Sequence, residues 1–166
     1  AKTSTELFEI PFEKLREEEG SYTSEAIKRG KLIHHLMEGV KTMDDLGSQI
    51  ALFVEKSILK ESMANELESQ IRHLLTDPRI ASLYSAVDHK SYAERGLLVP
   101  GKGQLVPDRV IENEKGVFVL DYKTGKKEAK HKSQIKGYMD TLKKMGYANP
   151  KGYLLYFDEG DLVEFV

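Results

Sequence analysis

The sequence lacks cysteine altogether in its 166 residues. That absence excludes disulfide bonds, thiolate zinc sites, cysteine nucleophiles and cysteine-held iron–sulfur clusters. It is compatible with a reducing compartment without proving one, and we expect a cytoplasmic location.

Long apolar runs are also missing. The longest of them is far too short to cross a bilayer, so we expect no membrane partner. The first twenty residues, "AKTSTELFEIPFEKLREEEG", contain no apolar signal core and do not begin with methionine. We therefore expect a domain taken from a longer polypeptide.

An excess of charge of one sign is lacking as well. The formal net charge is −2, which gives no overall indication of nucleic-acid binding but does not exclude a local basic patch. The hydrophobic fraction of 40% and the charged fraction of 31% are typical of a soluble globular protein. The length suits one domain with a substantial core, so we expect a single domain over residues 1–166.

The order of apolar patterns predicts a mixed α/β domain. Residues 1–22 resemble an irregular lead-in, and helical spacing begins at Ser24. Further helices are predicted near Thr42, over Ser62–Leu75 and after Asp77. The remaining predictions are three strands within residues 90–99, 103–113 and 117–123, a helix over about 130–145, and two strands within 151–157 and 161–166. We expect this long helix to cross over between strands of one sheet.

Two adjacent predicted strands carry charged residues, which are costly in a buried strand unless they are paired or bind a metal. "VPDRV" places Asp108 on one predicted strand, and "VFVLDYKTGKK" places Asp121 and Lys123 on the next. Residues two apart on a strand share a face, so Asp121 and Lys123 point the same way. If the strands pair, the two carboxylates meet and suit a hard divalent cation, with the lysine beside a phosphate oxygen. A surface hairpin with a salt bridge explains the same charges, and the charges alone do not decide.

Together these segments resemble the PD-(D/E)XK nuclease signature, with Asp108 as the first acid and Asp121-Tyr122-Lys123 as the second acid and the lysine. "RGKLIHHLME" resembles the Gly-x-x-x-His motif of the RecB-like branch through Gly30 and His34. "QIKGY" is similar to its Gln-x-x-x-Tyr motif. "YAERGLL" carries a glutamate where the family often has one. The resemblance is greatest to the C-terminal nuclease domain of UvrD/RecB-type helicases of the AddA kind, and it implies a restriction-endonuclease-like core, a mixed central sheet with flanking helices.

The resemblance also implies roles for individual residues. The implied catalytic residues are Asp108, Asp121, Lys123, Gln134, Tyr138 and Glu94. The implied metal ligands are His34, Asp108, Asp121 and the backbone carbonyl of Tyr122, around Mg²⁺ or Mn²⁺. Ordinary structural roles remain open for several of them: a packing histidine at His34, an exposed acid at Glu94 and a core tyrosine at Tyr138.

A basic cluster flanks this predicted site. We expect it to contact the DNA backbone, although a solvated loop and helix start would have the same composition. Its DNA-binding candidates are Lys126, Lys127, Lys130, Lys132 and Lys136.

The resulting hypothesis is a Mg²⁺- or Mn²⁺-dependent deoxyribonuclease without an iron–sulfur cluster. The resemblance implies an exonuclease acting in recombinational repair on DNA delivered by a helicase motor domain, expected in the same polypeptide. Two alternatives stay open: a free-standing nuclease of the superfamily acting on another nucleic acid, and a catalytically idle module that binds DNA or a helicase.

Overall fold

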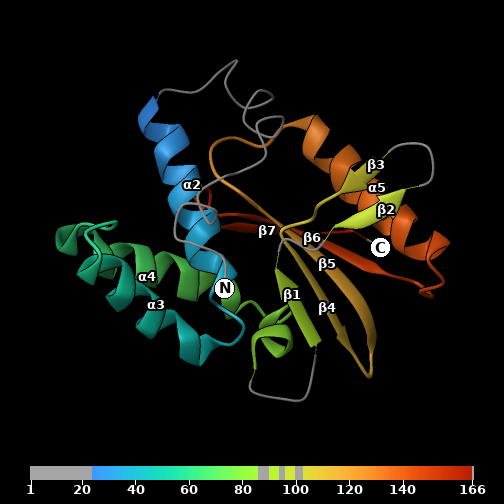
Figure 1. The fold of residues 1–166 in the computed structure, drawn as a ribbon, viewed down its shortest axis with the longest axis horizontal. Coiled ribbons are helices and arrows are strands. Elements are labelled where there is room, and N and C mark those ends of the chain that lie inside the picture. Colours follow the sequence, from blue (N-terminus) through green and yellow to red (C-terminus); the bar gives the residue numbers. More distant parts are fainter. Residues whose placement is uncertain (1–23, 86–89, 94–95, 100–102, 166) are drawn as a thin grey trace.

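The computed structural model describes residues 24–85, 90–93, 96–99 and 103–165. Figure 1 shows a group of helices beside one part of the sheet and a long helix apart from them. The helices are α2 (Ser24–Glu38), α3 (Met43–Glu55), α4 (Glu61–Leu75), the short 3₁₀ helix η2 (Ala81–Tyr84) and α5 (Ala129–Lys144). The strands are β1 (Lys90–Ala93), β2 (Leu97–Val99), β3 (Gly103–Leu105), β4 (Arg109–Asn113), β5 (Gly116–Lys123), β6 (Lys151–Tyr156) and β7 (Asp161–Phe165). The predicted lead-in, residues 1–22, lies outside the described residues.

The main sheet has five strands in the order β1-β4-β5-β6-β7. Only β5 and β6 are parallel, and α5 connects them, as the crossover prediction required. The hairpin of β4 and β5 is antiparallel, with Arg109 opposite Leu120. The mixed α/β fold expected from the sequence, with the α-rich half first, is therefore confirmed.

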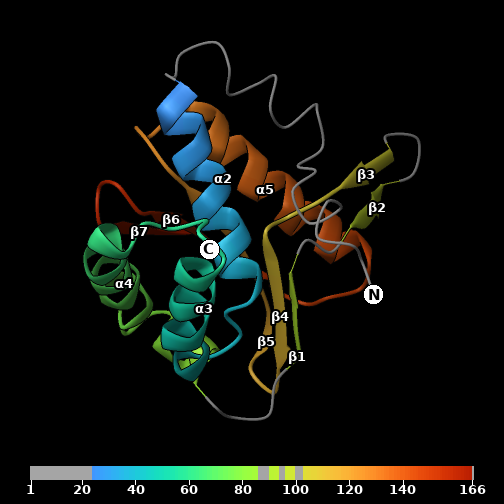
Figure 2. The same ribbon diagram turned by 60° about the vertical axis from the view of Figure 1, so that its left-hand side comes forward.

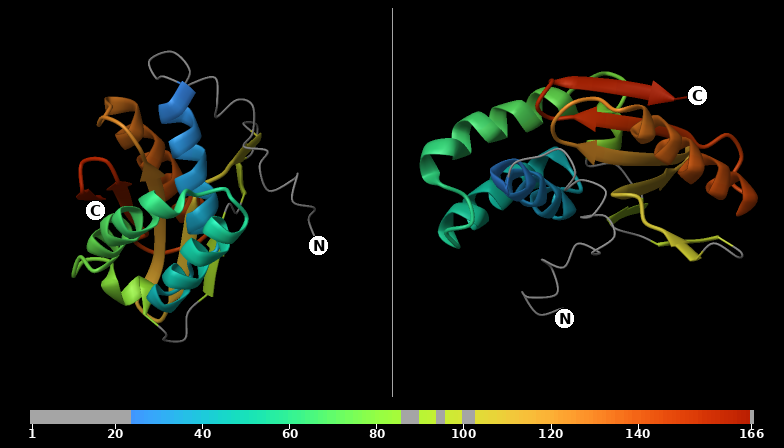
Figure 3. Two further views of the ribbon diagram at one scale, coloured as in Figure 1. Left: turned by 90° about the vertical axis from the view of Figure 1, so that its left-hand side faces the viewer. Right: turned by 90° about the horizontal axis from the view of Figure 1, so that it is seen from above.

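The two faces of the sheet are buried under different helices. Alternate residues of each strand point to opposite faces, so one strand contributes to both cores. One core joins α2, α3, α4 and η2 to side chains such as Ile111, Leu120, Tyr122, Tyr153 and Leu155. The other joins α5 to side chains such as Val110, Val117, Val119, Leu154 and Tyr156. Figures 2 and 3 show α3 and α4 away from α5, with α2 nearer to it.

Two long strands of the sequence interpretation are each divided in the structure. The predicted strand over 90–99 forms β1 and β2, and that over 103–113 forms β3 and β4. β2 and β3 pair with each other as a separate two-stranded sheet, whereas β1 pairs with β4. Pro107, between β3 and β4, has no N–H for a ladder bond, which explains the second interruption.

The helix ends follow local chemistry. The Asp45 carboxylate accepts a hydrogen bond of 2.9 Å from the Thr42 backbone N–H, which fixes the start of α3 as predicted. Gly146, with a φ of +100°, follows the end of α5. The helix predicted after Asp77 is instead a turn followed by η2, because Asp77 Oδ1 accepts from the Arg79 N–H two residues on. None of the helices in the described part of the chain is long and apolar enough to cross a membrane.

Candidate active site

The two acids predicted from the sequence meet at one end of the β4–β5 pair. Asp108 directly precedes β4, and its backbone N–H donates a hydrogen bond of 3.1 Å to Asp121 Oδ1 on β5. The Tyr122 backbone N–H donates in turn to Asp108 Oδ2 at 2.7 Å. Both residues are buried, with exposed fractions of 3% for Asp108 and 0% for Asp121. Buried carboxylates are expensive, so this pair needs a specific role.

Lys123 lies on the same strand face as Asp121, as the two-residue spacing predicts. Its Nζ lies 3.0 Å from Asp121 Oδ2 and donates a hydrogen bond of 2.7 Å to Oε1 of Gln134 on α5. Tyr122, between the two, points into the opposite core. One apolar strand therefore ends by presenting an acid and a lysine to α5 and an aromatic ring to the other helices.

His34 reaches Asp108 from α2. Its Nδ1 lies 2.9 Å from the Gly30 backbone carbonyl oxygen, and its Nε2 lies 3.1 Å from Asp108 Oδ2. A carbonyl only accepts, so Nδ1 carries the proton that it donates to Gly30. In the neutral ring, Nε2 is then an acceptor that faces another acceptor, the Asp108 carboxylate. A second proton on the ring, or a cation bound by both groups, makes this contact favourable. This geometry suits a metal-ligating histidine whose second nitrogen is held by a backbone carbonyl.

His35 has a different environment, although it follows His34 directly. Its ring lies 5.1 Å from that of Phe53 on α3, between centroids. Burial, followed by the positive charge of Lys56, lowers its pKa. The structure therefore places His34, and not His35, beside Asp108.

The Gln-x-x-x-Tyr segment of α5 contacts both acid-bearing segments. Gln134 accepts from Lys123 on β5, as described above. Tyr138, four residues later on the same helix face, donates from its hydroxyl to the Val106 carbonyl at 3.3 Å, just before Pro107-Asp108. Tyr138 is only 3% exposed, so its ring packs in the core while its hydroxyl holds the segment that precedes Asp108.

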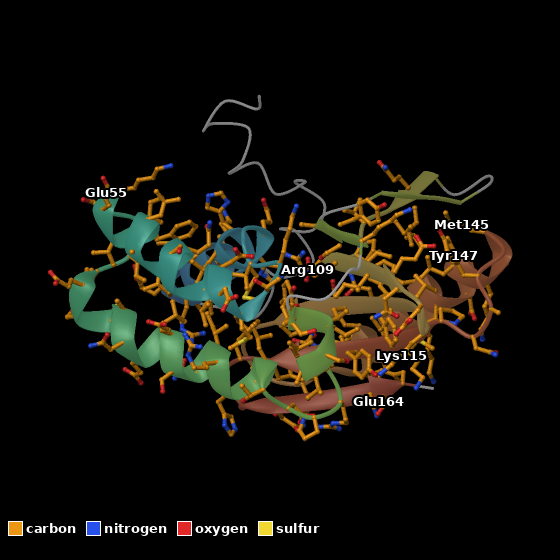
Figure 4. All side chains as sticks on the ribbon, turned by 90° about the horizontal axis from the view of Figure 1, so that it is seen from below. Glu55, Arg109, Lys115, Met145, Tyr147 and Glu164 are labelled. Carbon is orange, nitrogen blue, oxygen red and sulfur yellow. The ribbon has the colours of Figure 1, made fainter. Side chains whose placement is uncertain are left out.

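A buried arginine that sequence analysis did not select lies behind the acids. Arg109 has an exposed fraction of 0% and donates to the carbonyls of Met37 at 2.6 Å and Glu38 at 3.4 Å. These carbonyls end α2, where the negative end of the helix dipole favours a cation. Arg109 also donates to Ser91 Oγ at 2.6 Å. Figure 4 shows Arg109 in the interior, where the helical part meets the sheet.

Two tyrosines complete this buried network. Arg109 Nε donates to the Tyr122 hydroxyl at 3.0 Å, and that hydroxyl lies 2.7 Å from the hydroxyl of Tyr84. Burial raises the pKa of both phenols, so they stay neutral at physiological pH. A polar network of this kind has no periodic pattern in sequence, and the available signal was an arginine next to the apolar pair Val110-Ile111 at the start of β4.

The predicted basic cluster is only partly available for a ligand. Lys127 forms an ion pair with Asp161 and lies 3.6 Å from Glu159, and Lys130 lies 3.1 Å from Glu128. Lys126, Lys132 and Lys136 are exposed. Glu94, the remaining candidate, lies outside the part of the chain that the structure describes.

The donor chemistry suits a hard divalent cation, although the side chains bond one another in this arrangement. The carboxylates of Asp108 and Asp121 supply the oxygen ligands that such ions prefer, and the imidazole of His34 lies beside Asp108. Within residues 24–85, 90–93, 96–99 and 103–165, however, no three His, Cys, Asp or Glu side chains are grouped closely enough to hold a metal ion. The proposed ligands therefore fit by type and neighbourhood, and the metal site stays a prediction.

Comparison with known families decides the identity at the level of the superfamily. The model of the PD-(D/E)XK nuclease superfamily matches residues 12–164, nearly the whole chain. The chain belongs to the PD-(D/E)XK nuclease superfamily. The restriction-endonuclease-like core expected from the sequence accords with this membership and with the five-stranded mixed sheet.

Other comparisons add little to what this PD-(D/E)XK protein can be said to do. No curated protein sequence matches the chain. One solved structure that matches, described as "Crystal structure of SSO0001", is 16% identical and covers 98% of this chain and 75% of its own, with a TM-score of 0.31. A likeness that weak carries no argument about function.

Proposed function

We propose that this PD-(D/E)XK domain is a Mg²⁺- or Mn²⁺-dependent deoxyribonuclease that hydrolyses phosphodiester bonds. One observation carries the proposal: two buried carboxylates, Asp108 and Asp121, are hydrogen bonded through the backbone and contact a histidine and a lysine at one end of the sheet. A structural ion pair needs one acid and one base. A second acid and an imidazole beside that pair match the ligands of a metal ion that assists phosphodiester hydrolysis.

Each residue has a distinct role in this proposal. Asp108, Asp121, His34 and the Tyr122 carbonyl would hold the cation, which supplies charge neutralisation and a more acidic water. Lys123 orients the attacking water and stabilises the negative charge that develops on the phosphate oxygens. The water oxygen bonds to phosphorus and its proton passes to solvent, the bond from phosphorus to the departing sugar oxygen breaks, and that oxygen takes up a proton from solvent.

The decisive experiment is cleavage by the isolated protein with added metal. Labelled single- and double-stranded DNA are incubated with Mg²⁺, with Mn²⁺ or with a chelator, and the wild type is compared with Asp108→Asn and Lys123→Ala. We expect metal-dependent cleavage that Asp108→Asn abolishes. Lys123→Ala should lose about 10²–10³-fold in rate, as expected when one electrostatic group is removed. DNA binding without cleavage in the wild type would instead identify an idle binding module.

Metal binding is tested separately from cleavage. Calorimetric titration of Mn²⁺ should show binding that Asp108→Ala and Asp121→Ala remove, and that Lys123→Ala retains. Unchanged binding in both acid variants would refute the ligand assignment.

The finer part of the proposal is an exonuclease role beside a helicase motor in recombinational repair. Its support is the resemblance of Gly30, His34, Gln134 and Tyr138 to the RecB-like motifs, together with their positions around Lys123 and Asp108. A linear duplex and a closed circle of the same sequence separate the two modes of cleavage. Progressive loss of the linear DNA with an intact circle supports an exonuclease, and nicking of the circle contradicts it.

A further inference from the structure

Two neighbouring segments, the β6–β7 turn and α2, contact the end of β5 that carries Lys123. The Lys123 backbone carbonyl accepts a hydrogen bond of 3.0 Å from the N–H of Phe157, which directly follows β6. The Gly125 N–H donates to Asp158 Oδ2 at 2.6 Å. Thr124, between them, packs so closely on α2 that a Cβ built at Gly30 would lie 2.9 Å from its Oγ1. The backbone around Lys123 is therefore hydrogen bonded to the β6–β7 turn, and the side chain of Thr124 packs against α2.

A pocket beside Lys123 shows how these segments join. It is lined by α2, the β5–α5 loop, the start of α5 and Asp158. Its cationic side chains are already matched, because Arg29 forms an ion pair with Asp158 and Lys130 pairs with Glu128 at 3.1 Å. Burial, followed by nearby lysines, lowers the pKa of His131 to about 4, so that side chain is neutral at pH 7. The wall of the pocket is thus a set of internal contacts between elements rather than a ready anion site.

Asp158 is the residue that connects these contacts. Its Oδ2 accepts from Gly125, two residues after Lys123, and its Oδ1 faces Arg29 on α2. Gly125 has a φ of +79°, a conformation that glycine shares with many others, so its hydrogen bond to Asp158 selects this one. The same helix also carries His34, which contacts Asp108. One exposed carboxylate therefore joins the lysine-bearing turn to the helix that brings the histidine.

We infer that Asp158 is a positioning residue for Lys123. It fixes the Gly125 turn, so that Lys123 Nζ stays between Asp121 and Gln134. This inference rests on the proposed function, because it assumes that Lys123 acts in cleavage. A displacement of about 1 Å in a catalytic group can cost up to about 10²-fold in rate, so a loosened turn should be visible in kcat.

The test compares Asp158→Ala with Asp158→Asn. The alanine removes the acceptor for the Gly125 N–H, whereas the asparagine keeps a carbonyl oxygen there and loses only the charge that faces Arg29. We expect Asp158→Ala to lower kcat by about 10- to 100-fold with KM changed less than about 3-fold, and Asp158→Asn to recover most of that loss. Hydrogen exchange at the Gly125 amide gives a readout independent of activity. It should accelerate in the alanine variant and stay slow in the asparagine variant.

Glu159→Ala is the matched control. Glu159 is the next acid of the same turn, and it contacts Lys127 rather than the lysine-bearing strand end. We expect its kcat and its Gly125 exchange to equal those of the wild type.

Three results would overturn the inference: wild-type kcat in Asp158→Ala, a loss confined to KM, or an equal loss in the alanine and asparagine variants. Failure of the proposed function looks different. In that case Lys123→Ala itself cleaves DNA at the wild-type rate, or the wild type does not cleave at all.

Discussion

Lys123 Nζ on β5 and Gln134 Oε1 on α5 are joined by a hydrogen bond of 2.7 Å. The lysine comes from one short motif and the glutamine from another, eleven residues later. The bond turns α5 from a helix that covers a sheet face into a part of the site. Asp121 Oδ2 lies 3.0 Å from the same Nζ, so the two contacts together fix the orientation of the ammonium group.

Gln134→Ala should therefore lower activity through Lys123. Without the amide acceptor the ammonium group keeps only its contact with Asp121, and its direction is less defined. We expect kcat to fall by about 10-fold, with little change in metal affinity or melting temperature. Steady-state cleavage of labelled DNA measures this, with Lys136→Ala on the exposed face of α5 as a comparison that should alter KM rather than kcat. A Gln134→Ala protein with wild-type kcat would show that the hydrogen bond has no catalytic consequence.

Gly30→Ala should destabilise the protein, although alanine is the better helix former. The added Cβ would meet Thr124 Oγ1 at 2.9 Å, so the Thr124 side chain has to rotate, or α2 and the β5 turn have to move apart. We expect a net loss of about 1–2 kcal/mol in urea unfolding. Gly137→Ala is the control on α5, where a Cβ meets nothing within 4 Å, and it should gain up to about 1 kcal/mol. Adding Thr124→Ala to Gly30→Ala should restore much of the lost stability, and an unaltered deficit would contradict the steric explanation.

Arg109→Lys should be costly although the positive charge is kept. A lysine cannot reproduce the guanidinium fork that reaches the end of α2, Ser91 and Tyr122 together. We expect a loss of about 2–4 kcal/mol in the free energy of unfolding. Arg72→Lys, at an exposed pair with Glu68, should change it by less than about 1 kcal/mol. Similar small effects at both positions would mean that the buried network contributes little.

Stability should fall in mild acid because of His131. Burial, with Lys123 and Lys130 nearby, lowers its pKa from 6.5 to about 4 in the folded protein. Between these values the unfolded chain binds more protons, so stability decreases as the pH falls from 6.5 towards 4. The contribution is at most about 3 kcal/mol. His131→Gln removes this titration, so its unfolding free energy should vary less over the same range, and parallel pH profiles would exclude a contribution from His131.

The exposed lysines of α5 should contribute more to DNA binding than Lys127. Lys132→Gln together with Lys136→Gln should reduce the slope of log K against log salt by about 0.7 per lysine on single strands. Lys127→Gln should change it less, because Lys127 is paired with Asp161 and lies near Glu159. Fluorescence anisotropy over a salt series, in metal-free buffer, measures both slopes. Equal changes would mean that Lys127 leaves its carboxylate partners when DNA binds.

The sequence predicted the local parts of the site well and the connections between them poorly. Two-residue alternation placed Asp121 and Lys123 on one face, and pairing of adjacent strands brought Asp108 beside Asp121. Periodicity carries no such information about side-chain bonds between distant segments. Arg109 reaches Met37 across 72 positions, and Asp158 reaches Gly125 across 33. The division of the predicted strand over 103–113 was missed because apolar residues suited to strands, such as Val106 and Val110, stand on both sides of Pro107.

The position of β5 in the sheet has a consequence for biosynthesis. β5 carries the second acid and the lysine, yet its parallel neighbour β6 is synthesised only after α5. A nascent chain that has emerged only as far as Lys123 holds both acids and the lysine, but it lacks Gln134, the Phe157 N–H and Asp158, which fix that lysine. The chain therefore contains both acids and the lysine well before it can assemble the proposed site, which needs α5, β6 and the β6–β7 turn.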